Sequence, residues 1–252
     1  MSDEVKIKLT GKSRKKRQQT RRFTTKTVIS FLLVLILVPL TIYFGWKADR
    51  NFYVVSLLII LYSMIPFFAL FERRKPQARE LVLIAVMSGI AVVSRVAFIW
   101  LPHFKPIFAI IMITGISLGP EAGFLTGAVS GFVSNFIFGQ GVWTPWQMAA
   151  MGLAGFLAGL FFQKGWLPKE RIPLCVFGGL VNLCIIGPIL DTCTLFTMSA
   201  EITRESAAAI YLSGLPVNAI QSAATVLTLA LISRPLIEKL DRVKKKYGIL
   251  ED

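Results

Sequence analysis

Long apolar segments recur along this chain, and they constrain its fold more than any other feature of the sequence. A helix that crosses a membrane needs roughly 20 predominantly apolar residues. Segments that reach or approach this length cover residues 28–46, 52–71, 81–100, 107–118, 122–138, 147–162, 172–190 and 207–232. Of the 252 residues, 54% are hydrophobic and only 17% are charged, which argues against a soluble globular protein. We therefore expect an all-α integral membrane protein.

The basic residues are distributed unevenly between the ends of these segments. Ten Lys and Arg residues precede the first segment, and further groups lie at residues 73–79, 164–171 and 234–246. If the N-terminus is cytoplasmic, all of these groups lie on the inner side, as the positive-inside rule requires. The sequence therefore predicts a multi-pass protein with both termini in the cytoplasm. The net charge of +14 then reflects topology and contact with membrane lipids, in preference to nucleic-acid binding.

The character of the chain changes near residue 80. Residues 1–26 form a basic cytoplasmic segment, and residues 27–79 contain two plain apolar segments followed by a charged linker. From residue 80 to residue 238 the apolar segments carry glycines and isolated polar residues. We therefore expect a six-helix, substrate-binding membrane core at 80–238. Two extra transmembrane helices precede this core, and a basic cytoplasmic tail follows at 239–252.

Two glycine-rich segments flank a polar, aromatic turn in the middle of the core. The glycines recur every four residues, at Gly119, Gly123, Gly127 and Gly131 and again at Gly155 and Gly159. This spacing places them on one face of a helix, where a second backbone can approach closely. The turn between the two segments, QGVWTPWQ at 140–147, combines hydrogen-bonding groups with two indole rings. Such a mixture suits a planar polar ligand better than a lipid tail.

Isolated polar side chains lie within the apolar segments of the core. They are Arg95, Asn135, Gln147, Asn182, Asn218 and Gln221. Polar groups inside a bilayer are costly and usually face a cavity or each other. We therefore expect a pocket that opens to the outside and includes Gln140, Trp143, Thr144 and Trp146 of the turn and His103 of another outer loop. Two simpler roles remain open, because amides also link helices to one another and Trp is common at membrane surfaces.

Catalytic and metal-binding motifs are absent from the sequence. It contains no HExxH, no GxSxG and no paired acids within one apolar segment. The single histidine, His103, has no carboxylate or thiolate close to it in the sequence, so we expect no metal site. The sequence predicts neither an enzyme nor a bound cofactor. Any energy-driven activity would require an ATPase on another chain.

Three motifs together carry a resemblance to a known family. They are Ala85-x-x-x-Gly89, the segment GPEAGFLTG at 119–127, and the loop FGQGVWTPWQM at 138–148. With these motifs the core resembles the S component of energy-coupling factor (ECF) transporters, the substrate-binding membrane subunit for vitamin uptake in bacteria. The resemblance implies a pocket facing outward, a location in the bacterial cell membrane, and partnership with a transmembrane scaffold subunit and two ATPase subunits.

The resemblance also assigns a contact and a class of substrate. Family members pack small residues of the first core helix against the scaffold, which here implies Ala85 and Gly89. The loop is most similar to members associated with cobalamin or related corrinoids, while Trp143 and Trp146 equally suit a flavin, a pterin or another heterocycle. The alternative function is a stand-alone secondary transporter for a small organic molecule. That function needs coupling-ion chemistry, and the core has few acids to supply it.

Overall fold

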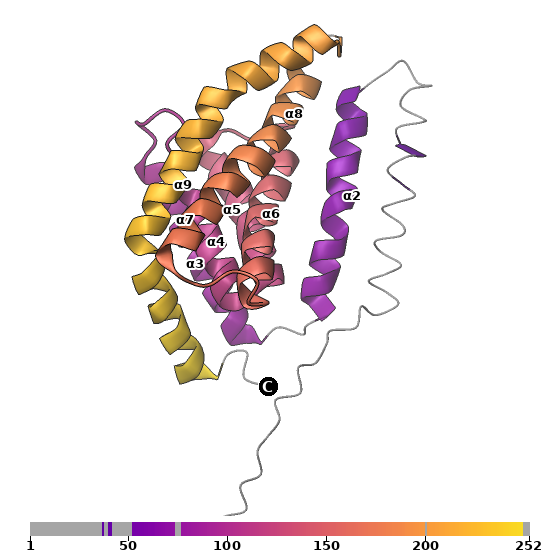
Figure 1. Ribbon diagram of the computed structural model, residues 1–252. Coiled ribbons are helices and arrows are strands. Elements are labelled where there is room, and N and C mark those ends of the chain that lie inside the picture. Colours follow the sequence, from indigo (N-terminus) through magenta and orange to yellow (C-terminus); the bar gives the residue numbers. More distant parts are fainter. Residues whose placement is uncertain (1–36, 38–39, 42–51, 74–76, 200, 249–252) are drawn as a thin grey trace, which may run out of the picture.

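The computed structural model describes residues 37, 40–41, 52–73, 77–199 and 201–248. Within these residues the chain is helical and contains no strand, as the sequence predicts for an integral membrane bundle (Figure 1). The basic segment at 1–26 lies outside the described residues, and so does the first predicted helix at 28–46 except for three positions. The described architecture therefore begins with the second predicted helix, which starts at Phe52.

The helices follow the predicted apolar segments closely. They are α2 (Phe52–Arg73), α3 (Ala78–Ala97), α4 (Ile107–Leu118), α5 (Pro120–Phe138), α6 (Thr144–Gln163), α7 (Arg171–Val181), the π-helix η1 (Asn182–Ile186), α8 (Gly187–Met198) and α9 (Arg204–Tyr247). Four helices of the described chain are long and apolar enough to cross a membrane, namely α3, α6, the continuous α7–η1–α8 and α9. Helix α5 is nearly as long as α3 and carries several glycines and hydroxyl side chains along its length.

Two helices run further than the sequence predicts. The segment expected at 172–190 continues to Met198, and the one expected at 207–232 becomes the 44-residue α9, about 66 Å long. Beyond residue 232 the chain stays helical because it is amphipathic. Ile237 and Leu240 are buried, while the Lys and Arg residues between and after them are mostly exposed.

Close backbone contact joins α5 to α6, as the glycine spacing predicts. A Cβ atom at Gly123 would meet the carbonyl group of Gly155, and one at Gly127 would meet the carbonyl group of Met151. At the other end of the pair, a Cβ atom on Gly159 would lie 2.6 Å from the Cα of Pro120. Side chains larger than hydrogen therefore cannot be accommodated at these positions without moving the two helices apart.

Helix α4 forms the centre of the bundle. All twelve of its residues are buried, and it packs against α3, α5, α6, α7 and α9. Helix α2 lies outside this core against α5, α6 and α8. Its Phe67 ring stacks on Phe124, with the ring centroids 4.2 Å apart, and meets Phe156 edge-on. The described part of the N-terminal extension therefore covers one face of the core.

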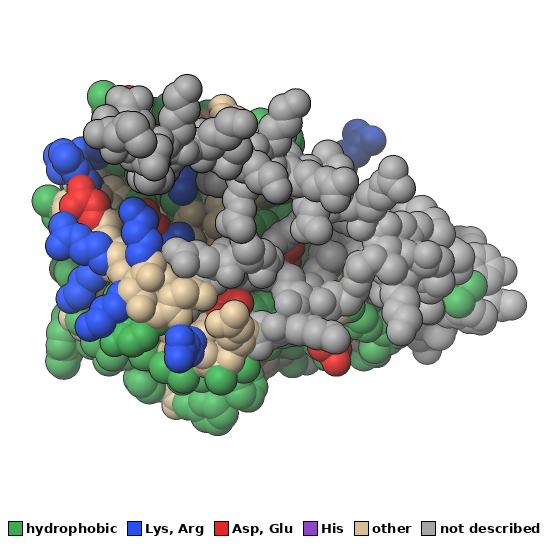
Figure 2. Space-filling model, turned by 90° about the horizontal axis from the view of Figure 1, so that it is seen from below, with side chains coloured by type: hydrophobic (Ala, Val, Ile, Leu, Met, Phe, Trp, Pro, Cys, Tyr) green, Lys and Arg blue, Asp and Glu red, His purple; other side chains and the backbone are tan. Residues whose placement is uncertain are grey.

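The two ends of the bundle differ in charge. One end, which the sequence predicts to face outward and which we call the outer end, carries the 98–106 loop, the 139–143 turn and the start of α9 (Figure 1). The basic end carries the 164–170 loop and the end of α9. Figure 2 views the molecule from the basic end, where Lys and Arg side chains gather on the surface. Two hydrogen bonds hold α9 at this end. Lys244 of α9 donates to the carbonyl of Ser117, and Arg79 of α3 donates to the carbonyl of Tyr247 in α9. A cytoplasmic location of the basic end stays a prediction.

Candidate substrate-binding site

The turn between α5 and α6 is held in shape by its own hydrogen bonds. The Thr144 hydroxyl, at the start of α6, donates to Gln140 Oε1 at 2.9 Å. It also accepts from the Asn135 amide and from the backbone N–H of Gly141, both at 3.1 Å. Gly139 has a φ of 101°, which suits glycine and lets the chain leave α5 sharply. Thr144 is therefore the centre of a network that fixes the turn.

Arg95 of α3 extends this network towards the neighbouring helix. Its guanidinium donates to the hydroxyl of Ser134 and, at 3.0 Å, to Oδ1 of Asn135. Its Cζ also lies 4.4 Å from the centroid of the Phe138 ring, a cation–π arrangement. We call Arg95, Ser134, Asn135, Gln140 and Thr144 the outer cluster. In this cluster both ends of the Asn135 amide have partners.

A second cation lies against the same aromatic ring. Lys105 Nζ is 5.1 Å from the Phe138 centroid and donates to the carbonyl of Phe98 at 3.1 Å. Partial burial, together with the nearby positive charge of Arg95, lowers the pKa of Lys105. The outer end of the bundle therefore holds two positive charges side by side, which favours ligands with negative or electron-rich groups.

A separate set of amides lies deeper, where η1 meets α9. Asn182 donates to the Thr225 hydroxyl at 2.6 Å and to the backbone carbonyl of Gln221 at 3.4 Å. Its own Oδ1 and the Oε1 of Gln221 are buried and accept no hydrogen bond from any described residue. We call Asn182, Gln221 and Thr225 the amide cluster. It holds two side-chain acceptors that the described protein does not satisfy.

The π-helical turn at the amide cluster has a local cause. Pro188 has no N–H, so it cannot donate to the carbonyl four residues earlier, at Cys184. The helix widens into the π-helical turn η1 shortly before Pro188, and η1 begins at Asn182. Such π-helical turns occur frequently at functional sites because they alter the direction of side chains.

Other predicted residues connect α6, α8 and α9. Asn218 donates to Asp191 at 2.7 Å, which links α9 to α8. Trp146 is buried, and its ring lies 6.1 Å from that of Phe196, which links α6 to α8. Beside it, Gln147 has a buried Oε1 without a hydrogen-bond partner among the described residues. Gln147 therefore shares the property that distinguishes the amide cluster.

The predicted ligand residues are thus not one continuous network. Hydrogen bonds among the described residues join Arg95, Asn135, Gln140 and Thr144 to one another, but none joins this outer cluster to the amide cluster. Trp143 is 43% exposed and bonds to the carbonyl of Gly139 at 3.3 Å, so its ring folds back on its own turn. His103 is exposed on the neighbouring loop and hydrogen-bonds to no other predicted site residue.

Sequence reasoning missed several residues that complete these clusters. They are Ser134, Phe138 and Thr225. Serine and threonine in membrane helices commonly bond to their own backbone, as Thr225 also does to the Gln221 carbonyl, so their positions give no signal of a site. Phe138 could be found only from its place at the end of α5, beside the polar turn.

The predicted partner contact lies on an open surface of α3. Ala85 and Gly89 are exposed, and a Cβ atom at Gly89 would meet no heavy atom within 4 Å. The exposed side chains of Val82, Val86 and Val93 surround them. Because Ala85 and Gly89 stay exposed, the described part of the N-terminal extension does not cover this face.

Comparison with known proteins assigns the family. A family model described as "ECF-type riboflavin transporter, S component" matches residues 75–242, which is more than half of the chain. The chain belongs to this S-component family. Its membership and its apolar helices place it in the membrane as a multi-pass protein of a transport system, and the predicted family resemblance is confirmed.

Several curated relatives are similar to parts of this S component. A UPF0397 protein of Vibrio atlanticus (strain LGP32) is 28% identical over 120 residues, covering 45% of this chain and 65% of the relative. A UPF0397 protein of Aliivibrio salmonicida (strain LFI1238) is 30% identical over 105 residues, covering 40% and 55%. The S component thus matches less than two thirds of each of these relatives. No solved structure matches it.

Proposed function

We propose that this S component captures a flat, heterocyclic vitamin from outside the cell, and that riboflavin is the first candidate. The observation that carries the proposal is the set of buried amide oxygens on Gln147, Asn182 and Gln221 that accept no hydrogen bond from described residues. Leaving a buried polar atom unsatisfied costs about 1–3 kcal/mol. A ligand with several N–H and O–H donors would remove that cost on binding, and the ring N–H and ribityl hydroxyls of riboflavin are such donors.

The family description gives a second reason to begin with riboflavin, since the matching family model is named for it. The corrinoid preference that the loop suggests gains no support from the comparisons. In this proposal the aromatic side chains of Trp143 and Trp146 supply stacking surface, and Arg95 attracts the electron-rich edge of the ring. Trp143 is half-exposed at the outer end, where an entering ring would meet it first.

The proposal also includes partners. The S component would dock on a transmembrane scaffold subunit through the open surface of α3 around Ala85 and Gly89. Two ATPase subunits bound to that scaffold would supply the energy, and this chain itself would catalyse no reaction. Small residues at such a position let two membrane helices approach closely, which supports this choice of surface.

Ligand titration of the purified chain tests the substrate. Riboflavin and cobalamin are titrated separately, and we expect saturable binding of riboflavin. Trp143→Ala should weaken that binding about three- to tenfold, the value of one aromatic contact. Arg95→Ala should weaken it as well, with membrane insertion intact. Trp166→Ala is the matched control, because Trp166 is 59% exposed at the basic end.

Three results would contradict the proposal. Unchanged affinity in both the Arg95 and the Trp143 variants would remove the outer residues from the site. If the chain binds cobalamin but does not bind riboflavin, the substrate is a corrinoid instead. Accumulation of substrate in vesicles that lack any ATPase partner, abolished when the ion gradient collapses, would favour a stand-alone secondary transporter.

A further inference from the structure

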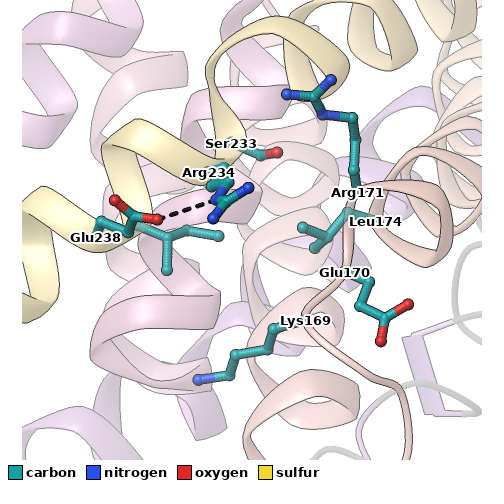
Figure 3. A pocket seen from close by; sticks show the side chains of 8 residues that line it. Lys169, Glu170, Arg171, Leu174, Ser233, Arg234 and Glu238 are labelled. Carbon is teal, nitrogen blue, oxygen red and sulfur yellow. Dashed lines mark hydrogen bonds and ion pairs between the residues drawn. The ribbon is translucent and has the colours of Figure 1, made fainter.

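A cavity of about 450 Å³ lies at the basic end of the bundle, far from the outer cluster. It is formed between the start of α7 and the last third of α9 (Figure 3). Lys169, Arg171 and Leu174 line one side, and Ser233, Arg234 and Glu238 line the other. Because its lining is charged and lies at the basic end of the apolar helices, we expect the cavity at the level of the lipid headgroups.

The charged residues around this cavity leave an excess of positive charge. Arg234 is paired with Glu238 at 3.1 Å, and Figure 3 shows that pair on the α9 side. Lys169 and Arg171 form no ion pair with any described residue. Besides Glu238, the acidic residue that lines the cavity is Glu170. Two cations are thus free to bind an anion from outside the chain.

The start of α7 adds hydrogen-bond donors to these charges. α7 begins at Arg171 and continues through η1 and α8 to Met198, and the Glu170 side chain makes no capping hydrogen bond. The first N–H groups of a helix have no partner within the helix, and the helix dipole favours an anion beside them. Phosphate groups bind at helix starts for this reason.

Ser233 provides an independent sign that something is missing from the cavity. Its side chain is only 1% exposed, and its hydroxyl has no hydrogen-bond partner among the described residues. In Figure 3 the hydroxyl projects from α9 towards α7, where the cavity lies. A buried hydroxyl without a partner is unfavourable unless a ligand satisfies it.

Exposed apolar rows lead away from the cavity into the membrane. On α7 the row consists of Ile172, Val176 and Leu180, which are 75%, 54% and 56% exposed. On α9 the exposed residues Leu227 and Leu231 run in the same direction. A molecule with a phosphate in the cavity could therefore lay hydrocarbon chains along these two helices, which a soluble phosphate could not.

We propose that the cavity between α7 and α9 binds the phosphate group of an anionic phospholipid, held by Arg171, Lys169 and the first N–H groups of α7. The acyl chains lie along the exposed rows of α7 and α9. Basic pockets between membrane helices bind anionic headgroups in this manner. The site is separate from the proposed vitamin site and does not depend on which vitamin is bound.

Native mass spectrometry of the delipidated full chain tests this site. Phosphatidylglycerol and phosphatidylcholine with identical acyl chains are added separately, and we expect preferential retention of phosphatidylglycerol. The double variant K169Q/R171Q should reduce that retention about tenfold or more, since charge-assisted hydrogen bonds to phosphate are lost. The matched control R242Q/K245Q removes two exposed charges of α9 outside the cavity and should leave retention unchanged.

Any one of three results would overturn the proposed phospholipid site. Equal loss in the cavity variant and the control would mean that only general surface charge acts, and equal retention in the cavity variant and the unmodified chain would exclude the cavity. Displacement of the lipid by excess inorganic phosphate, with no retention of phosphatidylglycerol afterwards, would assign the site to a soluble anion instead.

A second variant separates binding from folding. Ser233→Ala removes the unpartnered hydroxyl without changing any charge, so the Tm of the lipid-free chain should not fall. Retention of phosphatidylglycerol should fall about tenfold or more, the effect of losing one hydrogen bond to a charged group. A lower Tm with unchanged retention would show that the hydroxyl serves the fold and would contradict its place in the site.

Discussion

The outer cluster and the amide cluster contain similar amides in very different states. In the outer cluster, the Asn135 side chain accepts from Arg95 and donates to Thr144, so both ends are satisfied. In the amide cluster, Asn182 donates through its nitrogen while its oxygen has no described partner. The first arrangement builds structure, and the second leaves acceptors that the proposed vitamin would satisfy. The more prominent sequence motif therefore fixes its own turn, and the less prominent residues are the better candidates for ligand contacts.

The largest effect is expected for the helix pair beneath the outer cluster. Gly127→Val would place side-chain atoms against the Met151 carbonyl and force α5 away from α6. We expect a chain that no longer elutes as a single species from size-exclusion chromatography. Gly89→Val is the control, because its position on α3 is open and the variant should fold normally. A well-folded Gly127→Val would show that close packing does not support the turn.

A smaller loss of stability is expected within the outer cluster itself. Thr144→Val keeps the shape of the side chain but leaves the Asn135 amide and the Gly141 N–H without their acceptor. We expect a loss of about 2–4 kcal/mol, which thermal unfolding in detergent would measure. In the control, Thr228→Val, only a bond to the helix's own backbone is lost, so stability should hardly change. Equal stability in both variants would contradict the structural role of the outer cluster.

The opposite result is expected in the amide cluster. Gln221→Met removes a buried oxygen that has no described partner, so stability should stay constant or rise by up to about 1 kcal/mol. Vitamin affinity should fall about tenfold, because one ligand hydrogen bond is lost. Gln140→Met serves as the comparison, since Gln140 is bonded to Thr144 and to the Phe132 carbonyl and should lose stability. A marked loss of stability in Gln221→Met would remove the distinction between the clusters.

The smallest effect is expected for the outer loop. His103 has a φ of 61°, a left-handed conformation that is unfavourable for residues other than glycine. His103→Gly should therefore be neutral or more stable by up to about 1 kcal/mol. Vitamin affinity should remain within about twofold, because His103 hydrogen-bonds to neither cluster. A tenfold loss of vitamin affinity would show that this loop contributes to the binding site.

The helices could be predicted because apolar length and glycine spacing act locally, whereas the arrangement of the site could not. Position along a helix gives the depth of Asn135 and Asn182, but the rotation of each helix decides which residues they meet. That rotation is set by the contact between α5 and α6 and by the π-helical turn before Pro188. The cavity at Arg171 and Ser233 escaped prediction because its two sides are far apart in the sequence.

The burial of α4 has a consequence for how the protein is made. Its twelve residues extend only about 18 Å, too short to cross a bilayer unaided. In the finished protein, α6 and α9 help to enclose it, yet both are synthesised later. While the ribosome is still producing the second half of the chain, α4 must be held by lipid, by α3 or by the insertion machinery. Its final environment is complete only when the last helix arrives.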